Sequence, residues 1–240
     1  MTKWVGTFAF DLSMAVFRGQ TADNTWHAHA SLQLSVAQQG DLTVLGADGL
    51  AQTAAGLMTR PGYRHVLQAT QEATLVFIEP HLPLATALRA DAHAAGTSSL
   101  DTALTLALRQ AATPVDCLAV LAQLVPPQQP VLDHRIAQAL TWLVTSNASD
   151  AIAQAGALCG ISDSRLRALA RASLGTSLSQ WLMWRKLEAS GRAMMAGATL
   201  ADAAYAGGFA DQAHFTRTMR KVFGITPMTA ARVLHARDAG

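Results

Sequence analysis

Residues 199–227 read TLADAAYAGGFADQAHFTRTMRKVFGITP. The pattern predicts a short helix over residues 200–206, a tight turn at residues 207–208 and a second helix over about 211–223, because glycine takes the positive φ that a sharp turn needs. The apolar residues of the second helix recur at i, i+4, i+7 and i+8, a spacing that predicts one buried stripe. This stripe comprises Phe215, Met219, Val222 and Phe223.

The opposite face of the second helix is polar and basic, since about 100° per residue separates Thr216 and Arg217 from the stripe. Gly224 is expected to cap this helix and Pro227 to prevent its continuation. A short helix, a glycine turn and a second helix with a basic face form a helix-turn-helix, whose second helix enters the major groove of DNA. The candidate DNA contacts are Gln212, His214, Thr216, Arg217, Arg220 and Lys221. His214 could instead cap the helix, and Arg220 and Lys221 could form a solvated face.

The run GGFADQAHFTRTMRKVFGITP resembles the signature of AraC-type transcriptional regulators, in which GF-x-D-x-x-H/S-F-x-R precedes FG-x-x-P. The resemblance implies an all-α DNA-binding domain with two helix-turn-helix units, and Arg217 stands at the family's arginine position. It also implies that the protein is a sequence-specific transcriptional regulator of promoter or operator DNA, and not an enzyme.

A first copy of the unit is predicted from helices over residues 151–159 and 163–174, followed by a connecting helix over 177–196. The pattern GIS-x-S-R-L…LG-TS-x-S-x-W-L-x-x-R supports the same resemblance. The candidate DNA contacts of this unit are Ser164, Arg165, Arg167 and Arg171. Family members commonly carry arginine where this chain has Ala168, so we expect the second unit to perform most of the sequence reading.

Composition limits the classes of protein that fit. Half of the 240 residues are hydrophobic, and no apolar run reaches the 18 residues or more of a transmembrane helix, so no membrane partner is expected. Residues 1–130 carry 6 Lys and Arg against 9 Asp and Glu, whereas residues 131–240 carry 12 against 7. A basic C-terminal half indicates nucleic-acid contact at one end of the chain. Cys117 and Cys159 have no metal or redox spacing, which predicts reduced core residues of a cytoplasmic protein.

The N-terminal residues, about 4–80, alternate short apolar stretches with Gly, Asp and Pro, a rhythm typical of a β-sandwich or β-barrel. The clearest predicted strand spans residues 26–36. Its alternation places Trp26, Leu32 and Leu34 on one face and the polar residues His27, His29, Ser31, Gln33 and Ser35 on the other.

This segment resembles a cupin barrel. His27-x-His29-x3-Gln33-x6-Gly40 matches the first cupin motif except that Gln replaces Glu, and Pro61-Gly62-x-x-His65 matches the second with one residue missing. The resemblance implies that His65 lies on a facing strand and joins His27, His29 and Gln33. Three imidazoles and an amide oxygen suit a divalent Zn, Ni, Fe or Mn ion. The alternative is a metal-free cavity for a small-molecule effector.

The predicted fold class is therefore α+β and multidomain. A cupin-like sensor and dimerisation domain covers residues 1–129, with its barrel at about 4–80 and Leu-rich helices at about 82–125. An AraC-type DNA-binding domain covers 130–240, after a Pro-rich linker at 126–130. The helices predict a homodimer. Two alternatives are a metal-dependent cupin enzyme and a regulator whose N-terminal domain is only a dimerisation scaffold.

Overall fold

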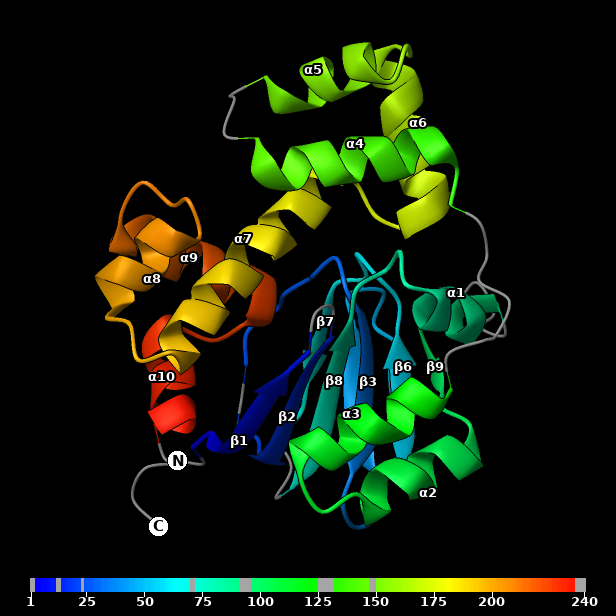
Figure 1. The fold of residues 1–240 in the computed structure, drawn as a ribbon. Coiled ribbons are helices and arrows are strands. Elements are labelled where there is room, and N and C mark those ends of the chain that lie inside the picture. Colours follow the sequence, from blue (N-terminus) through cyan, green and yellow to red (C-terminus); the bar gives the residue numbers. More distant parts are fainter. Residues whose placement is uncertain are drawn as a thin grey trace.

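The chain folds into an N-terminal part built on two antiparallel sheets and a C-terminal part built of helices (Figure 1). The computed structural model describes residues 3–11, 14–22, 24–69, 72–90, 96–124, 132–146 and 150–235. The predicted α+β class with an all-α C-terminal half is confirmed. The predicted linker, residues 126–130, lies outside the described residues, so the domain boundary stays a prediction.

The described strands form two sheets. The larger has the order β1-β2-β8-β3-β6-β9 and the smaller the order β5-β4-β7. Their bounds are β1 Val5–Phe10, β2 Met14–Gln20, β3 Leu32–Ala37, β4 Leu42–Gly46, β5 Ala51–Ala54, β6 Gly56–Thr59, β7 His65–Leu67, β8 Ala73–Ile78 and β9 Thr97–Ser99. The sequence did not predict β9, a polar segment that pairs antiparallel with β6 at the edge of the larger sheet.

The strand predicted over residues 26–36 is shorter than expected. β3 begins at Leu32, and the residues before it approach β7 of the smaller sheet, through an isolated bridge between His27 and His65. Both faces of β3 are buried, because β8 and β6 flank it and each face of the sheet is covered. Its apolar face lies in the core under the N-terminal helices, and its polar residues Gln33 and Ser35 are buried on the other face.

Three helices accompany the sheets, and α2 and α3 lie against one face of the larger sheet (Figure 1). They are α1 Pro83–Ala90, α2 Thr102–Gln110 and α3 Pro114–Gln123. Leu104, Leu108, Cys117 and Leu121 of α2 and α3 join Leu34 and its neighbours in one buried apolar cluster. The N-terminal helices therefore supply half of the core on that side of the sheet, and Cys117 is a buried free thiol as predicted.

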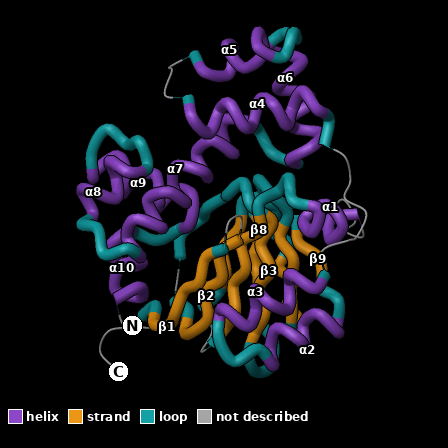
Figure 2. The backbone as a smooth tube through the Cα atoms, viewed as in Figure 1, coloured by secondary structure: helices purple, strands orange, loops and turns teal. Residues whose placement is uncertain are grey.

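The C-terminal helices form two compact groups joined by α7 (Figure 2). Their bounds are α4 His134–Thr145, α5 Ala151–Leu158, α6 Asp163–Leu174, α7 Leu178–Met195, α8 Leu200–Ala206, α9 Gln212–Phe223 and α10 Pro227–His235. Each group has its own apolar cluster, and Trp181 and Leu187 of α7 lie in one cluster each. Among the described residues, no helix combines the length and apolar character needed to cross a membrane.

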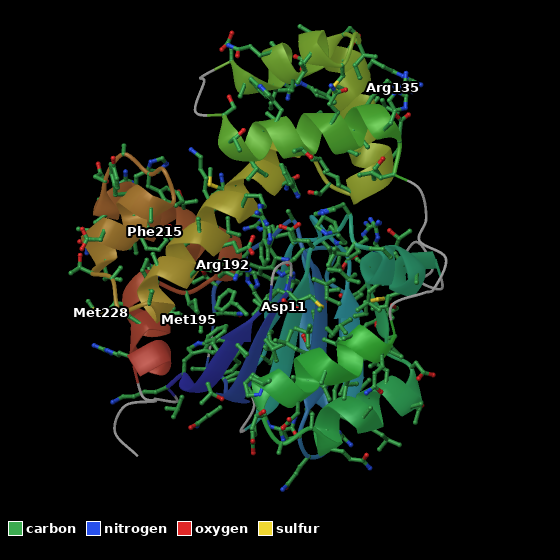
Figure 3. All side chains as sticks on the ribbon, viewed as in Figure 1. Asp11, Arg135, Arg192, Met195, Phe215 and Met228 are labelled. Carbon is green, nitrogen blue, oxygen red and sulfur yellow. The ribbon has the colours of Figure 1, made fainter. Side chains whose placement is uncertain are left out.

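The two parts of the chain meet along α7 and α9. Figure 3 labels Arg192 of α7 and Asp11 of the β1–β2 connection, which lie where the parts adjoin; the Arg192 guanidinium donates to the Asp11 carbonyl. The backbone N–H of Thr25 donates to the carbonyl of Gly224, at the end of α9, over 3.2 Å. The second helix-turn-helix unit is therefore hydrogen-bonded to the loop that leads into the histidine-bearing segment.

Candidate functional site

The second helix-turn-helix unit consists of α8, a turn at Gly207–Gly208 and α9. Gly208 has φ +67°, as the turn requires, and Phe209 is buried with its ring 5.2 Å from that of Phe215. The Asp211 carboxylate caps α9 by accepting from the backbone N–H of His214 over 2.6 Å. Gly224 ends the helix in the left-handed conformation at φ +73°. The predicted motif is therefore confirmed from turn to cap.

The outward face of α9 carries the predicted contact residues. Gln212, Arg217, Arg220 and Lys221 are exposed. Among the residues that the structure describes, no carboxylate forms an ion pair with any of these three cations. Exposed basic side chains without an ion-pair partner on one helix face can contact the phosphates or base edges of DNA.

Two other residues of α9 that were predicted to contact DNA, His214 and Thr216, interact with other residues of the protein. The ring of His214 lies 5.3 Å from that of Phe209 in an edge-on arrangement, while its backbone N–H is capped. The hydroxyl of Thr216 donates to the carbonyl of Gln212 over 2.8 Å. The cap of α9 is Asp211 and not the imidazole of His214, and DNA contact by His214 stays a prediction.

The first unit is formed by α5 and α6, with Ser162 as N-cap of α6. Ser164, Arg165 and Arg171 are exposed on α6, whereas Arg167 is paired with Asp163 at 3.0 Å. Ala168 is exposed among these arginines and offers no hydrogen-bonding group. This helix therefore presents two exposed arginines, and its share in reading bases stays a prediction.

The histidine residues predicted from the cupin resemblance come together in the structure. One ring nitrogen from each of His27, His29 and His65 lies within 4.8 Å of the others, and all three residues are buried. His65 comes from β7 of the smaller sheet, whereas Gln33 lies on β3 of the larger sheet. An isolated backbone bridge joins His65 to His27, so the segment before β3 connects the two sheets at this point.

The surroundings of two of the three rings favour metal-binding tautomers. The Nδ1 atoms of His27 and His65 lie 2.8 and 2.9 Å from the backbone carbonyls of Thr25 and Tyr63. Donation from these Nδ1–H groups leaves each Nε2 with a free lone pair, as in metal sites whose ligands are oriented by carbonyls. The ring of His29 differs, because its Nε2 donates to the Gln33 amide oxygen over 2.7 Å and its Nδ1 accepts from the Ser31 hydroxyl over 2.9 Å. The buried Nε2 of His65 has no hydrogen-bond partner in the structure.

Gln33 completes this group. Its Oε1 lies 2.7 Å from Nε2 of His29, and its Nε2 donates to the Ser35 hydroxyl over 2.8 Å. The amide is thus held with its oxygen toward the rings. The structure therefore brings a fourth candidate donor, the amide oxygen of Gln33, to the three imidazoles.

Burial keeps these imidazoles neutral. Desolvation, reinforced by the neighbouring histidines, lowers the pKa of His27 to about 2 and that of His29 to about 3. Burial also lowers the pKa of His65. Neutral imidazole is the form that binds metals.

A cavity of about 100 Å³ lies beside the histidines, between the sheets and the C-terminal helices. Its wall combines aromatic residues of the N-terminal part with residues of α7, α9 and α10; the aromatic ones are Trp4, Phe8, Phe10, Phe17, Phe77, Trp184, Phe215 and Phe223. His27 and Gln33 also line it. The sequence analysis missed this cavity. The only signal was the shared parity of Phe8 and Phe10 on β1, which does not reveal that α7 and α9 complete the wall.

A charged cluster joins the two parts next to the cavity. Arg185 of α7 lies 2.5 Å from the Glu79 carboxylate after β8 and 2.7 Å from that of Glu188, while His81 lies 3.0 Å from Glu79. Burial raises the pKa of Glu79 to about 7, although the charge of Arg185 acts in the opposite direction. Sequence reasoning also missed this cluster, because its members are more than 100 residues apart in the chain.

Comparisons with known proteins agree with this geometry. A family model described as a helix-turn-helix domain matches residues 156–232, from α5 into α10. A 1.65 Å structure of ToxT from Vibrio cholerae is similar over 93% of this chain and 99% of that one, with TM-score 0.62 and 10% identity. A ToxT structure described as bound to an unsaturated fatty acid is similar over 95% and 98%, with TM-score 0.61 and 11% identity. No curated protein sequence matches the chain.

The family match runs from the end of α5 through α6, α7 and the second helix-turn-helix unit, and the structural similarity extends over nearly the whole length of ToxT. The resemblance drawn from the motif around Phe209 and Arg217 is thereby confirmed. The C-terminal region of this chain is an AraC-type helix-turn-helix domain, and the protein is a DNA-binding transcriptional regulator with the two-part fold seen in ToxT.

Proposed function

We propose that α9 reads bases in the major groove and that α6 mainly holds phosphates in a neighbouring groove. The exposed, unpaired basic face of α9 in a helix-turn-helix unit carries this proposal. The 18 residues of α7 span about 27 Å, and major-groove faces on one side of DNA recur about every 34 Å. Because Trp181 and Leu187 fix α7 to both units, one chain can address two successive grooves.

The replacement Arg217→Ala should weaken binding to the protein's own promoter region by about 1–3 kcal/mol and relax specificity at one base pair, since a bidentate base contact is lost. The control is Arg64→Ala, which removes the same charge from an exposed site in the N-terminal part. Fluorescence anisotropy with promoter and scrambled duplexes at several salt concentrations measures both. Equal losses in the two variants, or equal affinity for the two duplexes, would contradict the proposal.

The N-terminal part is proposed to control DNA binding through a small molecule in the interdomain cavity. α9 supplies Phe215 and Phe223 to the cavity wall, so a ligand there touches the recognition helix directly. The fatty acid bound in a structure of ToxT, a protein of the same overall fold, supports this assignment. In this role the protein is a cytoplasmic regulator and not an enzyme.

A second candidate is control by a divalent metal held by His27, His29, His65 and Gln33. The observations that favour it are the close grouping of the three buried imidazoles and the buried Nε2 of His65, which has no hydrogen-bond partner. Zn, Ni, Fe or Mn suits this donor set. The ion would fix the Thr25–His27 segment, which is hydrogen-bonded to Gly224 at the end of α9.

Untagged protein should contain about one equivalent of a transition metal by elemental analysis, and His29→Ala should lose it, because a site with one ligand missing binds far more weakly. His134→Ala, at an exposed histidine of α4, is the control and should keep the metal. Less than about a tenth of an equivalent in the wild-type protein, unchanged in His29→Ala, would end the metal hypothesis.

The protein is also proposed to form a homodimer through α2 and α3. Leu106, Val115 and Leu124 are 48%, 55% and 43% exposed on or beside these helices. Exposed apolar side chains grouped on neighbouring helices are typical of an interface.

Light scattering at micromolar concentration should give the mass of a dimer for the wild-type protein and of a monomer for Leu106→Glu, since a buried charge disfavours the interface. Leu50→Glu, at a 64% exposed site in a turn, should stay dimeric. A wild-type monomer, with and without DNA, would rule the dimer out.

A further inference from the structure

The cavity between the sheets and the C-terminal helices holds polar atoms that the protein leaves unpaired. The indole N–H groups of Trp4 and Trp184 and the amide oxygen of Asn24 are buried without a hydrogen-bond partner, and all three residues line the cavity. Trp184 is only 4% exposed. Buried unpaired donors are rare and cost free energy. A ligand that accepts a hydrogen bond would remove this cost.

The charges around the cavity select against an anionic ligand. Among the described residues that line it, none is a lysine or an arginine, and the one carboxylate is Glu188. Glu188 is already paired with Arg185 and Arg192, at 2.7 and 2.8 Å. A carboxylate placed among these aromatic rings would lose its hydration without gaining a cation. The ligand should therefore be neutral.

The size and the walls of the cavity select an aromatic ring. The volume of about 100 Å³ is of the same order as the roughly 150 Å³ of an engineered apolar cavity that binds benzene, which suits a compact ligand. The rings of Phe77, Trp184 and Phe223 lie 5.5–6.0 Å apart, at interplanar angles of 40–89°. This tilted and edge-on arrangement suits another aromatic ring.

Resting on the proposed control by a small molecule in this cavity, we propose that the effector is a small neutral aromatic compound with a carbonyl, ether or ring-nitrogen acceptor. The acceptor receives a hydrogen bond from the indole N–H of Trp184, and the ring of the ligand packs against the cluster of Phe77, Trp184 and Phe223. A hydrogen-bond donor on the ligand would donate to the amide oxygen of Asn24. The effector class thus differs from the fatty acid bound in ToxT.

Three probes of matched size test the assignment on the full-length protein by fluorine NMR. They are 4-fluoroacetophenone, which is neutral with an acceptor, 4-fluorobenzoate, which is charged, and 1-ethyl-4-fluorobenzene, which has no acceptor. The first should bind about fivefold more tightly than the ethylbenzene, as expected for one hydrogen bond. It should bind at least tenfold more tightly than the benzoate.

Trp184→Phe keeps an aromatic ring but removes the indole N–H together with part of the ring system. It should weaken the acetophenone about fivefold more than the ethylbenzene, because both probes lose the same packing and only the acetophenone loses a hydrogen bond. Retained binding of the ethylbenzene shows that the variant keeps the cavity. Trp4→Phe repeats the test at the second indole. Equal or tighter binding of the benzoate or of a C16 unsaturated fatty acid, an unchanged acetophenone affinity in both variants, or no binding by any probe would overturn the assignment.

The promoter-binding comparison of Arg217→Ala with Arg64→Ala uses none of these probes. Failure of the ligand assignment and failure of the DNA-reading proposal are therefore observed separately.

Discussion

Replacement of Phe215 with alanine should lower the free energy of unfolding of the second helix-turn-helix unit by about 3–5 kcal/mol, the usual cost of emptying a buried phenylalanine site. Phe215 is 1% exposed and packs against Phe209 in the apolar cluster that joins α7, α8, α9 and α10. It also lines the interdomain cavity, and Figure 3 labels it on α9. One truncation therefore removes support from the recognition helix and from the wall of the effector site.

Urea denaturation followed by tryptophan fluorescence measures this loss. Tyr205→Ala is the matched control, since Tyr205 lies on α8 of the same unit with 86% of its surface exposed, and its removal should change stability by less than about 0.5 kcal/mol. Promoter affinity should fall in Phe215→Ala and persist in Tyr205→Ala. Similar stability in the two variants would show that the cluster does not hold α9.

Acidification should destabilise the metal-free Glu79→Gln protein by about 4 kcal/mol between pH 7.5 and 5.0. The pKa values of His27 and His29 are lowered in the folded state to about 2 and 3, mainly by burial. Below the unfolded pKa of about 6.5, the unfolded chain therefore binds protons that the folded chain does not, and stability falls as the pH falls. Each histidine contributes about 1.4 kcal/mol per pH unit, and His65 acts in the same direction.

Glu79 titrates in the opposite sense to the histidines, so the wild-type protein should lose less stability on acidification than the Glu79→Gln protein. Its pKa is raised to about 7 by burial, and the folded carboxyl therefore binds a proton between pH 7 and 4.5 while the unfolded one stays ionised. This offsets about 3 kcal/mol of the loss at pH 5.0. Urea denaturation of chelator-treated wild-type and Glu79→Gln protein at both pH values measures the difference. An identical pH dependence in the two proteins would contradict the assigned pKa of Glu79.

The sequence by itself determined the second helix-turn-helix unit almost completely. Its signals are local: the positive φ at Gly208, the cap at Asp211, the stripe through Phe215 and the terminator Gly224 all act within a few residues of one another. The basic face of α9 follows from the same periodicity, since helical geometry alone decides which side chains oppose the buried stripe. The family comparison and the structure add little to what these residues already specified.

Sequence spacing also selected His27, His29, Gln33 and His65, yet only the tertiary structure decided how they meet. The residues before Leu32 lie outside β3, and an isolated bridge between His27 and His65 links them to β7 of the smaller sheet. The interdomain cavity and the Glu79–Arg185 pair were not predictable, because Trp4, Phe77, Trp184 and Phe223 come from segments far apart in the chain. Helix and turn signals act over a few residues, whereas a cavity wall depends on how whole elements pack, and no single segment encodes that arrangement.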